Sequence, residues 1–375
     1  MRSSATVVWT KMTLRNNQLS DAVLSCVAIL VQERTSLCFR YFFVHISGKD
    51  FWLLFIGKVT NKYTASMNHE VFMQRCLELA AQGRGLVGSN PLVGSVLVRD
   101  GNIIAEGYYR GVGFDHAEVD MIKNCDQLIK PTDGLYVNLE PCCHTGKTPP
   151  CTDLIIESGI KHVVIGMMDP DERVSGQGKH QLIDSGVQVT GPVLRSQCER
   201  LNRGYISLRT KNRPYITLKR AQTFEGNVAN ADGSTLSITS QNQNKWSHAN
   251  LRATHDAILV GVQTVIADDP QLTNRISTYQ PIKIILDPDL RIPRDAKLID
   301  NRTIIITQKD AEPIGDAKVI TVPIIDNHFD WDVLWNQFST FHFPLSTILV
   351  EGGPKTWDAF WKASLVDEEV ILIGS

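Results

Sequence analysis

The chain has 375 residues, a net charge of -2 at pH 7, 43% hydrophobic residues and 21% charged residues. This length is sufficient for two ordinary domains with separate cores. The proportions are those of a globular protein, and the balanced charge offers no general surface for polyanions. We therefore expect no nucleic-acid partner.

The first 66 residues contain only short apolar runs, at 21–32 and 51–56. Both runs are shorter than the ~20 residues that a helix needs to span a bilayer, so we expect no membrane partner. No small-residue cleavage site closes the first run, which argues against a signal peptide. We expect residues 1–66 to be a poorly structured or spurious extension, with the functional protein beginning at Met67.

Alternating helix and strand patterns follow from Met67 and predict an α/β layered domain over residues 67–205. The expected order is a helix ending near Gly83, strands over 93–100 and 102–109, and a helix that begins near His116. The later elements are a strand over 135–140, a helix from Thr152, a strand over 162–165 and a helix–strand pair ending near Val193.

A second α/β pattern begins after a polar stretch, 195–214, within which we place the domain boundary. The second domain is expected over residues 213–375. Its predicted elements are a helix over 244–254 and strands over 215–221, 257–261, 282–287, 303–307, 318–323 and 346–353. The sequence lacks the G-x-G-x-x-G pattern of a Rossmann domain.

The clearest chemical signal is His116-Ala117-Glu118, followed by Pro141-Cys142 and then Cys151. Catalytic zinc takes three protein ligands and leaves a fourth position for water, and one imidazole with two thiolates supplies that set. Glu118 can then act on the water as a general acid–base without taking a coordination position. Clustering of cysteine beside histidine also indicates a reducing compartment, so we expect a cytoplasmic protein.

The alternative is a closed structural zinc site made by Cys142, Cys143, His144 and Cys151. That interpretation leaves His116 and Glu118 without a role. The H-x-E…P-C…C pattern is instead typical of zinc nucleobase deaminases, which act on an amidine carbon.

Longer motifs resemble both halves of the bifunctional riboflavin-biosynthesis deaminase–reductase family. Four motifs resemble the deaminase half: NPLVGSVLV at 90–98, HAEV at 116–119, LEPCCHTGKTPPC at 139–151 and DPDERVSGQG at 169–178. Four further stretches resemble the reductase half: RPYITLKRAQTFEG at 213–226 and residues 251–275, 284–287 and 350–353. The resemblance implies a cytidine-deaminase-like three-layer domain and a dihydrofolate-reductase-like domain, the latter lacking its C-terminal strands.

The resemblance also implies two reactions on a small phosphoribosylaminopyrimidine. The first is hydrolytic, zinc-dependent deamination of 2,5-diamino-6-(5-phosphoribosylamino)pyrimidin-4(3H)-one to 5-amino-6-(5-phosphoribosylamino)uracil. The second is NADPH-dependent reduction of the ribosyl group to give 5-amino-6-(5-phosphoribitylamino)uracil. Members of the family commonly form multimers, so the resemblance implies a homo-oligomer.

Site residues are carried over by their positions in the motifs. For deaminase substrate binding the resemblance implies Asn90, His144, Lys147 and Asp169. For NADPH binding it implies Gln222, Ser237, Thr264, Asp268 and the segment from Gly353 to Ala359. For reductase substrate binding it implies Thr235, Arg252, Leu272, Arg275 and Glu351, with Lys219 and Glu225 near the reacting sugar.

Three other functions remain as alternatives at this stage. The chain can be a deaminase alone, with an inactive or structural second half. It can be a nucleic-acid deaminase, which would call for a basic groove with stacking aromatics and a short C-x2-C spacing. It can also be a non-catalytic protein stabilised by zinc, in which Glu118 would have no chemical role.

Overall fold

The structure is a computed structural model. It describes residues 7–10, 26–31, 37–46, 49–58, 61–145, 149–171, 174–228, 238–276, 278–341 and 345–374, with side chains described from residue 69 onward. The chain divides into two units, residues 1–71 and residues 72–375. Each unit is described by itself below.

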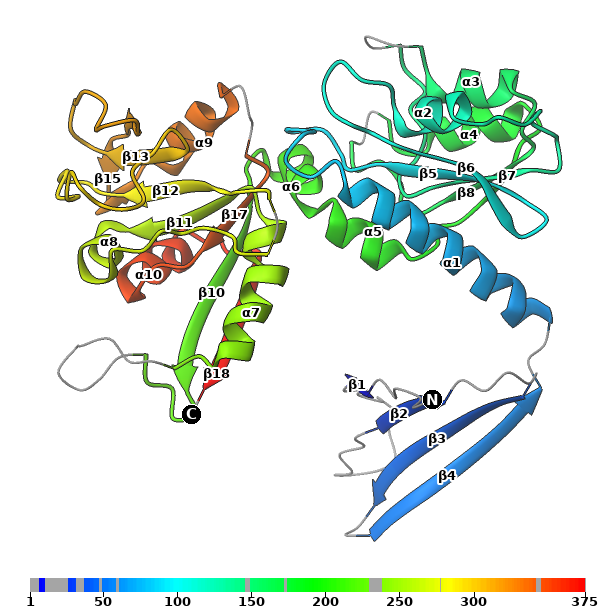
Figure 1. The fold of residues 1–375 in the computed structure, drawn as a ribbon, viewed down its shortest axis with the longest axis horizontal. Helices are drawn as coiled ribbons and strands as arrows, with labels where there is room; N and C mark the ends of the chain where they lie inside the picture. Colours follow the sequence, from blue (N-terminus) through cyan, green and yellow to red (C-terminus); the bar gives the residue numbers. More distant parts are fainter. Residues whose placement is uncertain are drawn as a thin grey trace. The chain divides into compact units, whose positions relative to one another are not determined.

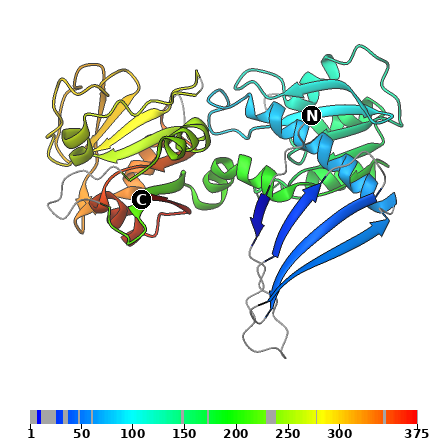
Figure 2. The ribbon, with the colours of Figure 1, turned by 60° about the horizontal axis from the view of Figure 1, so that its bottom comes forward.

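The first unit contains four strands and the beginning of a helix. The strands β1 (Val7–Thr10), β2 (Cys26–Val31), β3 (Leu37–Ile46) and β4 (Lys49–Lys58) form an antiparallel sheet in that order (Figure 2). Our expectation for this segment was little structure, and its status as an extension stays a prediction. Helix α1 (Asn61–Ala81) begins earlier than the sequence pattern indicated, but it ends close to the predicted Gly83.

The second unit begins with a five-stranded sheet of order β6-β5-β7-β8-β9. Its strands are β5 (Gly94–Arg99), β6 (Asn102–Tyr108), β7 (Gly134–Val137), β8 (His162–Ile165) and β9 (Gln188–Thr190). Strand β5 runs antiparallel to both β6 and β7, whereas β7, β8 and β9 are mutually parallel. All five strands were predicted at these places.

Helices cover both faces of this sheet, so the domain has three layers (Figure 1). One face carries α1 and α5 (Arg195–Leu201), and the other carries α2 (Ala117–Lys123), α3 (Cys151–Glu157) and α4 (Gln177–Asp184). Side chains alternate between the two faces as the strand period requires, with Val96 packing on the α1 side and Leu97 on the α2 side. The polar stretch in which we placed the domain boundary forms α5 and α6 (Arg203–Lys211).

The remainder of the chain builds a seven-stranded parallel sheet of order β14-β13-β12-β11-β17-β10-β18. The strands are β10 (Tyr215–Thr223), β11 (Ala257–Gly261), β12 (Ile282–Leu286), β13 (Thr303–Thr307), β14 (Lys318–Thr321), β17 (Thr347–Val350) and β18 (Glu368–Gly374). The central strands are apolar on both faces, as a parallel sheet covered on two sides requires.

Two hydrophobic cores lie on the two faces of this second sheet. One contains Trp331, Phe338 and Phe360, from helices α9 (Trp331–Ser339) and α10 (Pro354–Lys362). The other contains Leu251, which lies between α7 (Gln241–Asn250) and η1 (Arg252–Thr254), and Val265 of α8 (Val262–Asp268). A short hairpin of β15 (Ile324–Ile325) and β16 (His328–Phe329) completes the elements described.

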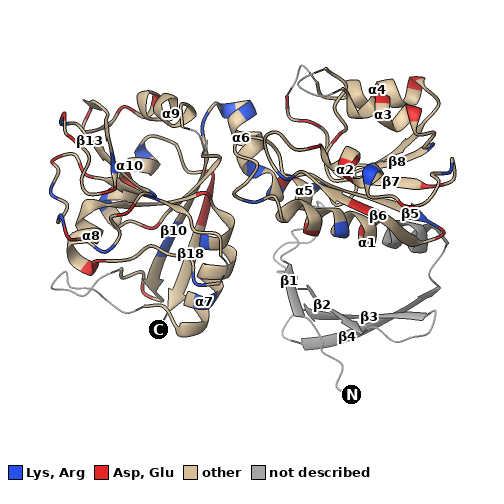
Figure 3. Cartoon of the chain, turned by 45° about the horizontal axis from the view of Figure 1, so that its top comes forward, with Lys and Arg blue, Asp and Glu red and all other residues tan. Residues whose placement is uncertain are grey.

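Two general features bear on the expected partners. Among the described residues, every helix is too short or too polar to cross a membrane. Acidic and basic residues are interspersed along the described elements of both α/β domains (Figure 3).

Candidate active sites

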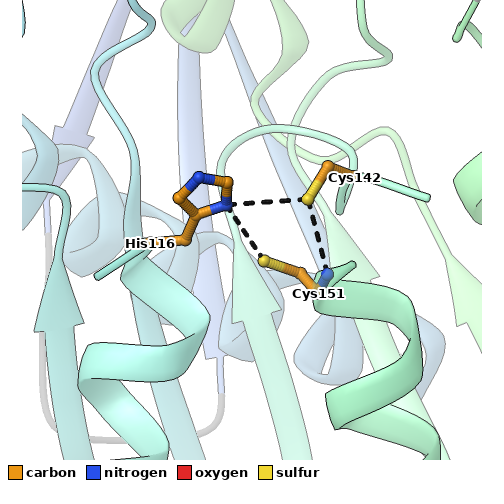
Figure 4. A group of neighbouring side chains, drawn as sticks. All are labelled: His116, Cys142 and Cys151. Carbon is orange, nitrogen blue, oxygen red and sulfur yellow. Dashed lines mark hydrogen bonds between the residues drawn. The ribbon is translucent and has the colours of Figure 1, made fainter. Parts of the chain in front are cut away.

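Three side chains that can hold a metal ion meet near the carboxyl end of strand β7 (Figure 4). His116 immediately precedes α2, Cys142 lies in the loop after β7, and Cys151 is the first residue of α3. Nδ1 of His116 lies 3.3 Å from Sγ of Cys151 and 3.6 Å from Sγ of Cys142. The three ligand atoms lie within 4.8 Å of one another, and among the described residues no further side chain joins this group.

The electrostatics of the cluster favour a thiolate. A hydrogen bond from the Cys151 thiol lowers the pKa of Cys142, and the neighbouring imidazole of His116 acts in the same direction. The backbone N–H of Cys151, at the first turn of α3, also donates to Sγ of Cys142 over 3.4 Å. The start of α3 therefore helps to stabilise the thiolate form of Cys142.

Glu118 lies beside the three ligands and is almost completely buried, at 4% exposure. Burial, assisted by repulsion from Cys142, raises the pKa of Glu118 to about 7. A carboxyl group with this pKa can both accept and release a proton at neutral pH. The sequence pattern predicts a general acid–base role for Glu118, and this pKa is compatible with it.

A glycine allows α2 to hold His116 and Glu118 so close to the sheet. A Cβ atom at Gly107 would lie 2.3 Å from the backbone nitrogen of Met121 and 2.6 Å from the carbonyl oxygen of Ala117. Strand β6 and helix α2 thus approach at a distance that no side chain permits.

The long loop between the two cysteines is only partly described. His144 is exposed, and Cys143 lies outside the ligand group. These positions give no support to the closed site of Cys142, Cys143, His144 and Cys151. Lys147 lies outside the described residues, so its proposed contact with substrate stays a prediction.

Asn90 lies on the loop that leads into β5, and its side chain donates to the hydroxyl of Tyr109 over 3.1 Å. Tyr109 in turn packs edge-on against the ring of His116, with ring centroids 5.8 Å apart. Sequence reasoning gave Tyr109 no role. Its position between Asn90 and His116 makes it a candidate for the same site.

Two buried asparagines fix the chain where this loop enters the sheet. Asn202 accepts from the backbone N–H of Leu92 over 2.8 Å, and Asn138 accepts from Gly94 over 2.8 Å. Both asparagine amides also donate to the carbonyl oxygen of Leu92. Side chains therefore satisfy the N–H groups of Leu92 and Gly94 and the carbonyl oxygen of Leu92.

Asp169 lies after β8, and its carboxylate is already engaged. It accepts from the backbone N–H of Asp171 over 2.9 Å and from the hydroxyl of Tyr205 over 3.3 Å. Burial raises the pKa of Asp169. The backbone N–H of Asp169 donates to Glu140, a buried residue of the cysteine loop to which the sequence analysis gave no role.

In the second domain, three of the predicted site residues, Gln222, Glu351 and Gly353, lie at or just beyond the carboxyl ends of the parallel strands. Gln222 lies near the end of β10, and Glu351 follows β17. Gly261 ends β11, and Gly352 and Gly353 lead into α10. Ligands of open parallel sheets bind at this edge.

Glycines let the chain before α8 and α10 pack closely on Thr356, and a third glycine leaves the backbone open. A Cβ at either Gly261 or Gly352 would lie 2.7 Å from Oγ1 of Thr356, whereas one at Gly353 would meet nothing within 4 Å. The backbone at the start of α10 is therefore accessible, and such helix starts favour phosphate. Thr264 and Asp268 both lie on α8, which begins directly after Gly261.

Arg252 and Glu351 form a partly buried ion pair at the same edge. The Nη2–Oε2 distance is 2.8 Å, and Arg252 also donates to the carbonyl oxygen of Thr273 over 3.0 Å. Burial opposes ionisation of Glu351, but the attraction and hydrogen bonds of Arg252 outweigh it and lower its pKa. Arg275 is exposed.

Three other predicted residues fit less directly. Leu272 is buried at 4% exposure and packs within the hydrophobic core, so its side chain serves packing. Thr235 and Ser237 lie outside the described residues. Their roles toward substrate and cofactor stay predictions.

Comparisons with known proteins match both domains of the chain. Residues 66–167 match the cytidine and deoxycytidylate deaminase zinc-binding region, and residues 214–375 match the RibD C-terminal domain. The riboflavin biosynthesis protein RibD of Aquifex aeolicus is 40% identical over 309 residues, covering 81% of this chain and 86% of that protein. The RibD protein of Escherichia coli is 35% identical over 326 residues, with 82% and 88% covered.

Solved structures give the same result. A diaminohydroxyphosphoribosylaminopyrimidine deaminase/5-amino-6-(5-phosphoribosylamino)uracil reductase from Thermotoga maritima has a TM-score of 0.72 and 36% identity, covering 82% of this chain and 87% of that one. RibD of Acinetobacter baumannii has a TM-score of 0.70 at 28% identity, with the same coverage. The chain therefore belongs to the RibD family, as a bifunctional riboflavin-biosynthesis enzyme with a zinc-dependent deaminase domain and an NADPH-dependent reductase domain.

Proposed function

We propose that the chain converts 2,5-diamino-6-(5-phosphoribosylamino)pyrimidin-4(3H)-one to 5-amino-6-(5-phosphoribosylamino)uracil and then reduces the ribosyl group of that product. The observation that carries the first step is the meeting of His116, Cys142 and Cys151 beside the buried carboxyl of Glu118. The second step is supported by the match of residues 214–375 to the RibD C-terminal domain.

Zinc fits the first site because of the donor set. One imidazole nitrogen and two sulfur atoms within 4.8 Å are the soft and borderline ligands that zinc prefers. We assign His116 Nδ1, Cys142 Sγ and Cys151 Sγ as the ligands. When bound, zinc would lower the pKa of a coordinated water so that it attacks at neutral pH.

Glu118 would move the protons of this reaction. Its carboxylate would accept a proton from the attacking water and deliver it to the amino group that leaves as ammonia. Burial raises the pKa of Glu118 to about 7, which suits a group that must both take and give a proton. Asn90 and Asp169, with His144 and Lys147 of the loop between the cysteines, would bind the substrate.

In the reductase domain, the strand ends would orient cofactor and sugar. We assign Gln222, Thr264, Asp268 and Gly353 to NADPH, with Ser237 added from the sequence motif. The accessible backbone at Gly353 is suited to its phosphates. NADPH supplies a hydride when bound, and the contribution of the chain would be alignment of the two reactants.

The second substrate carries a phosphate and a sugar. Arg252 and Arg275 would bind the phosphate. Glu351 and Thr235 would line the rest of the site, whereas Leu272 would border it only through its backbone, because its side chain packs in the core. Arg252 is held in place by its ion pair with Glu351, so its guanidinium is pre-oriented toward the strand ends. Fixed guanidinium groups bind phosphate well.

We also propose a cytoplasmic location and a homo-oligomeric state. The six cysteines of the described residues 69–374 are free, which suits a reducing compartment. A deaminase with an inactive second half is not favoured, since both domains match the family.

The test is to incubate purified, zinc-loaded protein with the diaminopyrimidinone phosphate, with and without NADPH, and to identify the products by mass. We expect ammonia and the uracil without NADPH, and the ribityl product when NADPH is added. Ammonia release without any NADPH consumption would leave only the deaminase step. Absence of ammonia would overturn the assignment of the first site.

A further inference from the structure

Glu140 stands immediately before Pro141 and Cys142, and its side chain is buried at 4% exposure. Its carboxylate accepts three backbone hydrogen bonds from one segment of the chain, residues 169–179. The donors are the N–H groups of Asp169 at 3.1 Å, Gly176 at 3.0 Å and Lys179 at 3.0 Å. Within the described residues, Glu140 has no ion pair with a basic side chain.

The three hydrogen bonds fix the position of Glu140 relative to the segment 169–179. A buried carboxylate costs free energy unless hydrogen bonds satisfy it, and here backbone donors do so. The donors come from both ends of the segment, so one side chain fixes its entry at Asp169 and its exit at Lys179. The other end of Glu140 is fixed as well, because its own N–H donates to the carbonyl oxygen of Met167 over 2.9 Å.

Two further contacts hold helix α4, into which the segment 169–179 continues, against the cysteine loop. A Cβ at Gly178 would lie 2.1 Å from the carbonyl oxygen of Pro141, so helix α4 packs directly on the loop. Thr152 contacts both the carbonyl oxygen of Cys142, at 3.3 Å, and the side chain of Gln181, at 2.9 Å. The loop that supplies a metal ligand and the segment that carries Asp169 therefore form one connected structure.

We infer that Glu140 is a positioning residue for the deaminase reaction. It sets the distance between the cysteine loop and the segment 169–179, and so places Asp169 for contact with the substrate. The inference rests on the proposed function, in which Asp169 binds the pyrimidine substrate. Glu140 itself touches neither the metal ligands' donor atoms nor, on this assignment, the substrate.

Replacing Glu140 by Gln tests this role in the full-length, zinc-loaded enzyme. The amide keeps the size of the side chain but turns an NH2 group toward backbone donors, so the three hydrogen bonds cannot all form. We expect the KM for the diaminopyrimidinone phosphate to rise about tenfold to a hundredfold, with kcat within about threefold of wild type. Zinc content and reduction of the deaminated substrate should be unchanged.

A double substitution asks whether Glu140 acts through Asp169. If it does, E140Q combined with D169N should raise KM little more than D169N alone, because both remove the same contact. Glu140→Asp keeps the charge but is shorter, and should give an intermediate KM. Glu157→Gln, an exposed glutamate on α3, is the matched control and should behave as wild type.

The outcomes separate the two claims. An inactive wild-type protein would overturn the proposed function itself. An active wild type with an unchanged KM in E140Q would overturn only the inference about Glu140. Loss of zinc or of reductase activity in both E140Q and E140D would also overturn it, because Glu140 would then support the metal site or the fold as a whole. Additive effects of E140Q and D169N would show that Glu140 does not act through Asp169.

Discussion

The deaminase and reductase domains assemble their candidate sites in different ways. In the deaminase domain, three ligands come from two helix starts and one loop, and their donor atoms lie within 4.8 Å. In the reductase domain, the candidate residues are spread along the carboxyl ends of β10, β11 and β17 and the helices that follow them. The first site is a compact group of side chains, and the second is an edge of a sheet.

This difference separates two sources of function. A metal site needs particular atoms at short distances, so a few residues carry most of the chemistry. A hydride-transfer site needs two bound molecules in alignment, so many residues each contribute a little. We therefore expect single substitutions to have larger effects on deamination than on reduction, and effects in one domain to leave the other intact.

The largest effect is expected from Glu118→Gln. The amide cannot accept the proton from the attacking water, and general acid–base groups contribute about 10²- to 10⁴-fold. We expect the deaminase kcat to fall about a thousandfold, with zinc retained in metal analysis and the reductase rate unchanged. Near-normal ammonia release would show that the buried carboxyl is not the proton carrier.

Arg252→Met should have the next largest effect, and on reduction alone. The change removes the phosphate contact proposed for Arg252 and leaves the carboxylate of Glu351 without its cation. We expect the KM for the deaminated substrate to rise about tenfold to a hundredfold, and the free energy of unfolding to fall by about 3 kcal/mol. Steady-state kinetics and denaturant unfolding measure the two effects, with the exposed Arg294→Met as control.

Gly107→Ala is expected to weaken deamination through the backbone. The new methyl group would overlap helix α2 and push His116 and Glu118 away from the cysteines. We expect a loss of about 1–3 kcal/mol in the free energy of unfolding and a reduced zinc affinity in competition with a chelator. Gly134→Ala is a suitable control, because its nearest atom would be 3.4 Å away. Equal zinc affinity in both variants would contradict this account.

The smallest effect concerns pH and stability. Asp133 is fully buried and accepts two hydrogen bonds from Arg99, both at 2.8 Å, which lower the pKa of its carboxyl. Because the folded state has the lower pKa, this stabilisation is present above the ordinary aspartate pKa of about 3.9. It is lost as the pH falls through the folded-state value.

Unfolding of the wild type and of Asp133→Asn, followed from pH 7 down to strongly acidic pH, measures this term. The difference in stability between the two proteins should be constant from neutral pH to about pH 4 and shrink below it. A difference that instead grew on acidification would show that Arg99 does not stabilise the ionised carboxylate.

Much of the architecture could be predicted because its signals are local. Strands β8 and β13 have the predicted bounds, since each is a continuous apolar run between polar turns. The grouping of His116, Cys142 and Cys151 could be predicted because histidine and cysteine in this pattern are typical of a zinc site. The metal site was therefore the part of the molecule most readable from the sequence.

Other features depend on contacts between distant residues. Glu140 and its partner Lys179 are 39 positions apart, and nothing in either local sequence indicates that they meet. Helices α5 and α6 were obscured by polar composition, although Cys198, Leu201 and Tyr205 have the spacing of a buried helical stripe. Helix α1 extends back to Asn61, beyond the change in composition at Met67 that we used to mark its beginning.

The buried asparagines at the entrance to β5 have a consequence for how this enzyme can vary. Asn138 and Asn202 anchor the chain just downstream of Asn90, and the N–H of Asn90 itself donates to the carbonyl oxygen of Val87 in the preceding turn, so Asn90 is held from both sides. Insertions or deletions between Gly83 and Ser89 should then displace Asn90, because they would break its hydrogen bond to Val87. Loss of either buried asparagine should displace Asn90 as well, even in a chain whose turn sequence is untouched.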